Sequence, residues 1–255
     1  MNLVDRDLKE FLDLKVDTYN TKGFIEDDPI SIPHLFSRKE DIESIGFIMA
    51  TISWGKRNMI IKNGHRLLEI MGNQPYDYIM NASEQDLADM VFVHRTFNAV
   101  DLNFFILSLR NIYLNYPEGL EAAFMLNTSS MAERICAFRE VFTSIPHEQR
   151  SEKHLSNPLK GSASKRINMF LRWMVRNDKR GVDFGIWNQI SMADLYIPLD
   201  VHTGNIARKL GLIKRKQNDW KALEELMNNV RKFDPDDPCK YDYALFGLGV
   251  TGELV

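Results

Sequence analysis

Apolar residues recur at helical spacing along most of the chain, and no stretch alternates convincingly between apolar and polar residues as a strand would. Residues 3–19 carry four apolar side chains near a 3.6-residue period: Leu8, Phe11, Leu12 and Val16. Residues 42–52 are apolar on nearly all sides, which is typical of a buried helix. The pattern therefore predicts an all-α fold, with this second segment as the central helix of one lobe.

Capping signals and polar gaps divide the rest of the chain. Ser37 followed by Glu40 has the pattern of a capping box, and Asp101 is the expected N-cap of a helix over residues 102–116. One or two helices are predicted over 120–142, and further helices after residue 58, after Lys165, over 220–230 and over 241–249. Residues 21–37 and 143–157 are predicted to be loops.

The composition excludes several classes of protein. Hydrophobic residues make up 44% and charged residues 26%, as in ordinary globular proteins, and no apolar run approaches the roughly 18 residues that span a membrane. The first residues lack the apolar core of a secretory signal, and Cys136 and Cys239 are isolated, so we expect a cytoplasmic protein. Two cysteines exclude a four-cysteine iron–sulfur cluster, and we expect no metal and no cofactor. The net charge of −3 means that any affinity for nucleic acid requires a local basic surface.

Asp200 stands between an apolar approach ending in Leu199 and a predicted helix that contains Ile206 and Leu210. This carboxylate has two compatible interpretations. It can be the N-cap of the helix, accepting a backbone N–H of the first turn. It can also be a catalytic carboxylate, desolvated by its apolar neighbours and held rigidly by the helix.

Residues 161–165 form a second candidate site at the start of another helix. Gly161, two serines and Lys165 provide a small-residue helix entry, where free N–H groups and the helix dipole favour a phosphate. The apolar stripe of this helix is predicted to face the core, and Lys165, Arg172 and Arg176 to form a basic stripe on another face. Lys165 can be an amine nucleophile, a phosphate contact or a solvated surface charge.

Two further segments carry candidate nucleic-acid contacts. Residues 53–57 change abruptly from apolar to small, polar and basic residues, which suits either an ordinary corner between helices or phosphate contact. His94 and Arg95 can contact DNA, or they can be a structural pair bonded to backbone carbonyls.

The whole chain resembles an uncharacterised bacterial family of unknown function, most clearly over residues 165–175 and 241–249. More remotely, Leu199-Asp200-Val201-His202-Thr203 and the helix after it resemble the catalytic signature of the helix-hairpin-helix DNA glycosylases, the superfamily of endonuclease III. Residues 161–165 resemble the hairpin of that superfamily, with Ala163 in place of its second glycine.

The glycosylase resemblance implies a single two-lobed helical unit over residues 1–255 with a central cleft. Its core lobe spans approximately 38–157, and its second lobe combines 1–37 with 158–255. The implied partner is double-stranded DNA with one base flipped out of the helix. The implied catalytic residues are Asp200 and Lys165. The expected nucleic-acid contacts are Gly161, Ser162, Ser164, Arg166, Arg172, Ser53, Trp54, Lys56, Arg57, His94, Arg95 and His202.

The implied reaction breaks an N-glycosidic bond, and Asp200 would stabilise the positive charge that develops on the sugar. An amine attacks only when it is neutral, so burial and cations such as Arg166 and Arg172 would have to favour proton loss from Lys165. Attack by Lys165 gives a Schiff base and strand cleavage, whereas attack by water only removes the base. The alternatives are a non-catalytic nucleic-acid-binding protein of the same fold and an enzyme acting on a small substrate.

Overall fold

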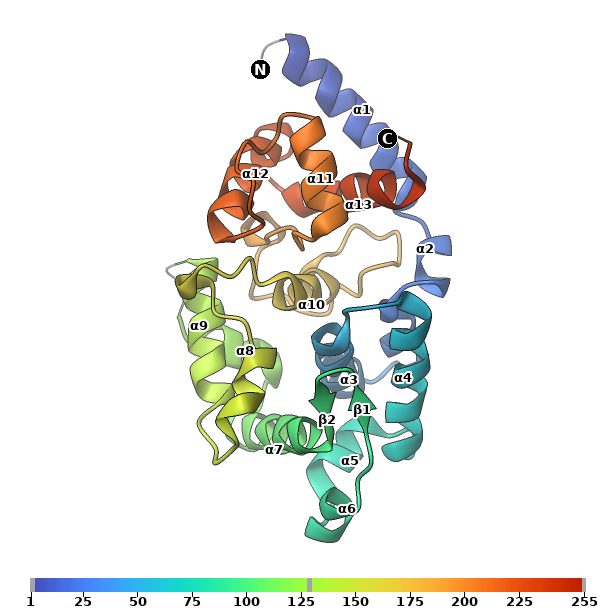
Figure 1. Ribbon diagram of the computed structural model, residues 1–255, viewed down its shortest axis with the longest axis vertical. Coiled ribbons are helices and arrows are strands. Elements are labelled where there is room, and N and C mark those ends of the chain that lie inside the picture. Colours follow the sequence, from blue (N-terminus) through green and yellow to red (C-terminus); the bar gives the residue numbers. More distant parts are fainter. Residues whose placement is uncertain (1–2, 128–129, 254–255) are drawn as a thin grey trace. The chain divides into compact units, whose positions relative to one another are not determined.

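The computed structural model describes residues 3–127 and 130–253, and their regular secondary structure is almost entirely helical (Figure 1). Among these residues the only sheet is a hairpin of two short antiparallel strands, β1 (Val93–His94) and β2 (Phe97–Asn98). The all-α prediction is confirmed, with this hairpin as its exception. No helix of the described residues is both long and apolar enough to cross a membrane.

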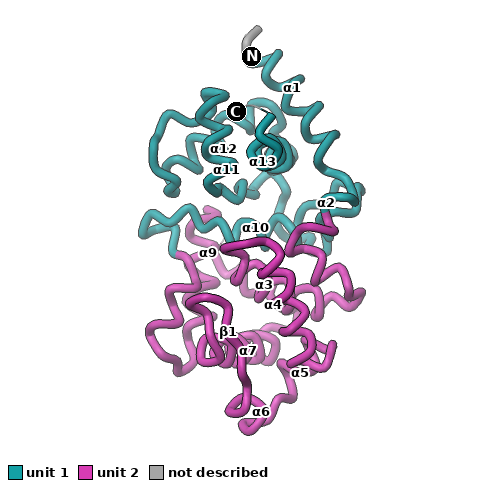
Figure 2. The backbone as a smooth tube through the Cα atoms, turned by 45° about the vertical axis from the view of Figure 1, so that its right-hand side comes forward, with its two compact units in different colours: residues 1–24, 157–255 teal, residues 25–156 magenta. Residues whose placement is uncertain are grey.

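The chain divides into two compact units, of which unit 1 contains residues 1–24 and 157–255 and unit 2 contains residues 25–156 (Figure 2). The short helix α2 (Gly23–Glu26) spans the first boundary. Residues 25–37, which we assigned to the other lobe, belong to unit 2. The cleft expected between two lobes stays a prediction.

Unit 2 is built around helix α3 (Lys39–Ile52), in which every residue from Ile42 to Ile52 is buried. This agrees with the buried central helix predicted from the apolar run. Its other elements are the 3₁₀ helices η1 (Pro29–Ser31), η2 (Pro33–Leu35) and η3 (Gln149–His154), and the helices α4 (Arg57–Ile70), α5 (Pro75–Asn81), α6 (Glu84–Ala88), α7 (Ala99–Asn115), α8 (Leu120–Phe124) and α9 (Met131–Phe142).

Phenylalanine rings fill the core of unit 2. The ring of Phe47 on α3 lies 5.8 Å from that of Phe105 on α7 and 5.4 Å from that of Phe138 on α9, measured between centroids. Aromatic pairs at such separations add to the free energy gained from burial alone. This core fixes the positions of α3, α7 and α9, and so of the α3–α4 corner that carries residues 53–57.

Unit 1 contains α1 (Leu3–Tyr19), α10 (Lys165–Val175), α11 (Val201–Lys209), α12 (Trp220–Phe233) and α13 (Tyr241–Thr251), with the 3₁₀ helices η4 (Pro158–Lys160), η5 (Met192–Asp194) and η6 (Pro238–Lys240). Helix α13 packs against both α1 and α11. Gly247 permits the first contact, because a Cβ there would lie 2.3 Å from the ring of Tyr19. The predicted apolar stripe of α10 is buried throughout.

Four local predictions are wrong. Residues 21–37 and 143–157, predicted to be loops, contain short helices: α2, η1 and η2 in the first segment, where a proline begins each of the two 3₁₀ helices, and the six-residue η3 in the second. Helix α3 begins at Lys39 with Arg38 as N-cap, so the predicted Ser37–Glu40 capping box does not form. Asn98, not Asp101, caps α7; Asp101 is the third residue of that capping box and bonds the N–H of Asn98.

Candidate functional site

Asp200 caps helix α11, as predicted. Its Oδ1 accepts the backbone N–H of Thr203 at 2.9 Å, and its own carbonyl accepts a hydrogen bond from the side chain of Asn218 at 2.8 Å. Asn218 is held in turn by Arg208, whose Nη2 lies 2.6 Å from Asn218 Oδ1. One carboxylate oxygen of Asp200 is therefore fixed by the helix, and the other is free to face a neighbouring group.

That neighbour is Lys165, the first residue of α10. Its Nζ lies 3.4 Å from Oδ2 of Asp200, and the two side chains are 35% and 14% exposed. The pair is thus neither buried in the core nor fully solvated, so a ligand can approach it from solvent. The structure brings together the two residues that we predicted to be catalytic, although thirty-four residues separate them in the sequence.

Asp242 on α13 is a third ionisable group of this site, and the sequence analysis missed it. Its side chain is buried, and its Oδ2 accepts a hydrogen bond from Arg172. Burial raises the pKa of the Asp242 carboxyl to about 6. The nearby positive charges of Arg172 and Lys165 oppose this rise, and the negative charge of Asp200 adds to it. The carboxyl therefore lies within electrostatic reach of both predicted catalytic residues.

A buried ion-pair network lies behind Asp242. Arg172 Nε donates to Asp183 Oδ1 at 3.2 Å, and Arg176 Nη1 donates to the other oxygen of Asp183 at 3.1 Å. The hydroxyl of Tyr243 donates to the same carboxylate at 2.8 Å. The prediction that Arg172 contacts nucleic acid is therefore wrong: its side chain is 5% exposed, and two carboxylates already neutralise it. Because two carboxylates pair with Arg172, its positive charge contributes little to the electrostatic field at Lys165.

The segment before Lys165 forms a tight turn. Gly161 is exposed and adopts a left-handed conformation at φ 91°, and its N–H donates to the carbonyl of Pro158. The N–H of Ser162 is used in the same way by Asn157. Ser164, also left-handed, is the N-cap of α10 but makes no hydrogen bond from its side chain to the first turn. Two of the N–H groups expected at a phosphate are thus already used, whereas the first turn of α10 is left without a side-chain cap.

The other predicted contacts of unit 1 lie at different depths. His202 is exposed on α11, with Nδ1 3.2 Å from the carbonyl oxygen of Gly249. Arg166 is partly exposed, and burial of its guanidinium lowers its pKa to about 10. The Ser164 side chain is 2% exposed and bonds the carbonyl of Ser162, so we correct the prediction that this side chain contacts nucleic acid.

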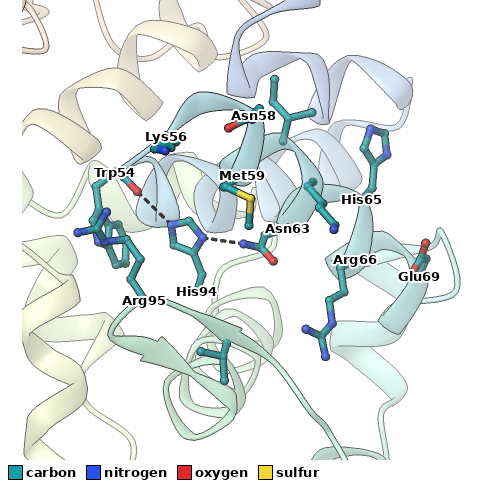
Figure 3. Close-up of a pocket in the computed structure, with 13 residues that line it drawn as sticks. Trp54, Lys56, Asn58, Met59, Asn63, His65, Arg66, Glu69, His94 and Arg95 are labelled. Carbon is teal, nitrogen blue, oxygen red and sulfur yellow. Dashed lines mark hydrogen bonds between the residues drawn. The ribbon is translucent and has the colours of Figure 1, made fainter.

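In unit 2 the structure brings Trp54 and Lys56 together with His94 and Arg95 at a pocket of about 930 Å³ between α4 and the β1–β2 hairpin (Figure 3). His94 joins the two segments: Nε2 lies 3.1 Å from the Trp54 carbonyl oxygen, and Nδ1 lies 2.8 Å from the Asn63 side-chain amide. These contacts fit a neutral ring that donates from Nε2 and accepts at Nδ1, and burial lowers the pKa of His94. His94 is 3% exposed, so the carbonyl-bonded alternative describes it better than direct DNA contact.

The remaining residues of this region have separate positions. Arg95 is exposed and lies against Gly55, where a Cβ would approach its Nη1 to 2.8 Å. Lys56 is exposed and lines the pocket, whereas the partly exposed Arg57 is not among its lining residues. Ser53 is 6% exposed and donates to the carbonyl of Met49 at 2.7 Å, so we correct its prediction as a nucleic-acid contact.

The described residues contain no group of three or more histidine, cysteine or acidic side chains arranged to hold a metal ion.

A family model described as "Protein of unknown function (DUF2400)" matches residues 28–251 of the chain. The chain belongs to this family. Membership in DUF2400 confirms the resemblance over most of the chain, while the remoter relation to the DNA glycosylases stays a prediction. No curated protein and no solved structure matches the chain.

Proposed function

We propose that the protein is a DNA glycosylase that removes a damaged base and that can also cleave the strand through Lys165. The observation that carries the proposal is the distance of 3.4 Å between Lys165 Nζ and Asp200 Oδ2 at a partly exposed site. An amine nucleophile beside a rigidly held carboxylate is the arrangement that such chemistry requires. The proposed partner is duplex DNA with one base flipped out.

Asp200 has two tasks in the proposed reaction. As the bond between base and sugar breaks, its electron pair leaves with the base, and the negative charge of Asp200 stabilises the cationic sugar. The neutral amine of Lys165 then forms a bond to the cationic sugar carbon, and Asp200 Oδ2 accepts the proton that the nitrogen releases as this bond forms. The hydrogen bond from Thr203 to Oδ1 holds the carboxylate in place without using the oxygen that faces the amine.

Asp242 has a supporting part in this proposal. It is buried, the charges of Asp200 and Lys165 act on it, and its pKa of about 6 means that its charge changes in the weakly acidic range. When ionised it adds a second negative charge to the surroundings of Lys165. When protonated it leaves Asp200 as the acidic partner. The proposed strand cleavage should therefore depend on pH through a residue that does not itself touch the substrate.

The test is to incubate the protein with duplexes that carry oxidised, alkylated or deaminated bases, and then to add borohydride, which traps a Schiff base. The unmodified protein should release a base and form a trapped adduct with at least one duplex. Lys165→Ala should abolish trapping and Asp200→Asn should slow base release by roughly a hundredfold or more, while Lys153→Ala, which alters an exposed lysine of unit 2, should change neither. If no duplex of a broad panel is cleaved or trapped, the proposal is wrong.

If Lys165→Ala keeps base release but loses trapping, then Lys165 holds a phosphate and water attacks the sugar. That outcome keeps the glycosylase and removes the strand-cleaving step. If the protein binds DNA and Asp200→Asn changes neither binding nor any product, a non-catalytic nucleic-acid-binding protein is the better description.

A further inference from the structure

The pocket in unit 2 is a strongly basic groove along the outer face of α4. Four of its lining side chains, Lys56, Lys62, Arg66 and Arg95, are exposed cations, and Glu69 is its one carboxylate. In a chain with a net charge of −3, such a concentration of positive charge is local to this surface. Cations gathered in a concave site attract an anionic ligand more strongly than the same charges spread over a convex surface. We call these residues and the pocket between them the α4 groove.

The α4 groove also offers surface that a simple anion would not use. Met59 and Val93 line it and are 46% and 57% exposed. Trp54 is partly exposed at one end, where its ring packs against His94 and His154. Asn58, which precedes Met59 on α4, is an exposed residue that also lines the groove (Figure 3). Apolar and aromatic side chains can take the flat face of a base, and an amide can bond its edge.

We propose that the α4 groove binds a single strand of nucleic acid, with phosphates on its cations and bases against its apolar and aromatic side chains. From Lys56 to Arg66 the helix rises about 15 Å, at 1.5 Å per residue. That length spans about four nucleotides of a strand stacked as in duplex DNA, at about 3.4 Å each. A pocket of about 930 Å³ is the size of a small-ligand site and does not enclose a duplex. An acidic peptide would meet the cations, but it has no flat bases for the other side chains.

The inference shares with the proposed function only its choice of a nucleic acid as partner. It concerns a different site, because Lys62 and Arg66 belong to unit 2 and the pair of Lys165 and Asp200 belongs to unit 1. The residue that holds the groove together is His94, which ties the hairpin to α4 through Asn63 and to the α3–α4 corner through the Trp54 carbonyl. A single strand would thus be bound by a surface whose shape is fixed before the ligand arrives.

The test measures binding of a fluorescently labelled oligothymidylate by anisotropy over a series of salt concentrations. The double variant Lys62→Gln with Arg66→Gln should bind at least tenfold more weakly. Its slope of log affinity against log salt should be smaller by about 1.4, since each phosphate contact of a single strand contributes about 0.7. The double variant Lys22→Gln with Lys153→Gln removes two exposed lysines elsewhere and should bind like the unmodified protein. Lys62→Arg with Arg66→Lys should restore most of the affinity.

Three outcomes would overturn the inference. The first is an equal loss of affinity in both double variants, and the second is displacement of the oligonucleotide by polyglutamate at the same concentration of charge. The third is photocrosslinking of the oligonucleotide to unit 1 peptides alone, with none in residues 54–66 or 91–95. Because Lys165→Ala and Asp200→Asn should leave this binding intact, failure of the excision assay and failure of the groove are separate results. Thermal unfolding of each variant checks that it is folded.

Discussion

Asp200 is predicted to stabilise the fold and to act in catalysis through different atoms, and two substitutions can separate these tasks. Asn keeps an oxygen that accepts the Thr203 N–H, and asparagine caps helices about as well as aspartate. It removes only the ion pair with Lys165, worth about 0–1 kcal/mol for a side chain that is 35% exposed. Ala removes the cap as well, which costs about 1 kcal/mol more. Asp200→Asn should therefore lower the free energy of unfolding by less than about 1 kcal/mol, and Asp200→Ala by about 1–2 kcal/mol.

The catalytic effects should not follow this order. Both substitutions remove the negative charge opposite Lys165, so both should slow base release by roughly 10²–10⁴-fold. The assays are urea unfolding for stability and single-turnover base release for activity. Asp219→Asn is the matched control, because Asp219 caps α12 through the Ala222 N–H at 3.0 Å and also pairs with a cation, Arg215. It should cost stability and leave base release unchanged.

Two results would refute this reasoning. If Asp200→Asn released base at the unmodified rate, the carboxylate would have no part in the chemistry. If Asp200→Asn were as unstable as Asp200→Ala, the cap hydrogen bond would not be what Asp200 contributes to the fold.

Three further predictions concern the surroundings of the site. The pKa of Asp242 is raised from 3.8 to about 6, so this carboxyl binds a proton more tightly in the folded protein than in the unfolded chain. Relative to Asp242→Asn, the unmodified protein should lose about 3 kcal/mol of unfolding free energy between pH 4 and pH 6, and no more above pH 6. If urea denaturation showed the same pH dependence of stability for both proteins, the assignment would be contradicted. Arg172→Met should cost about 3–5 kcal/mol, because it leaves the buried carboxylate of Asp242 without its cation and leaves Asp183 with Arg176 alone; a loss of DNA affinity with unchanged thermal stability would instead support direct DNA contact by Arg172. Gly247→Ala should destabilise the contact between α1 and α13 by about 1–3 kcal/mol and expose α1 to limited proteolysis, while Gly23→Ala, whose Cβ would make only an ordinary contact of 3.7 Å with Thr21 Oγ1, is the control; equal protease sensitivity in the two variants would argue against the contact.

Some local features were predictable because one segment contains the residues that decide them. The cap at Asp200 follows from an acidic residue before a short amphipathic helix, and the burial of α3 follows from a run that is apolar on every face. The start of α7 shows the limit of this reasoning. Asn98 and Asp101 are both good capping residues, and the side chains that bond Asp101, Ser151 and Arg150, lie about fifty residues further along the chain. Sequence spacing alone could not choose between the two.

In the candidate site, too, some residues could be predicted from the sequence and others could not. The sequence marked Lys165 and Asp200 singly, each by its position at the start of a helix, but only the fold placed one 3.4 Å from the other. Asp242 escaped notice because it stands in an otherwise apolar helix, and its partner Arg172 is seventy residues away in the chain. A lone acidic residue in a buried helix is the signal that could have found it, since a buried carboxylate needs a partner.

By itself the sequence determined the helical class, the buried helices and the cap at Asp200, because hydrophobic periodicity and hydrogen bonds of the first turn act over a few residues. The tertiary structure alone decided which charges meet. Arg172 and Lys165 lie on the same helix at helical spacing. Arg172 is buried and paired with two carboxylates, whereas Lys165 is partly exposed beside Asp200. The strength of an interaction between charges depends on their separation in space and on how much water surrounds them. Neither quantity can be read from the order of residues along the chain.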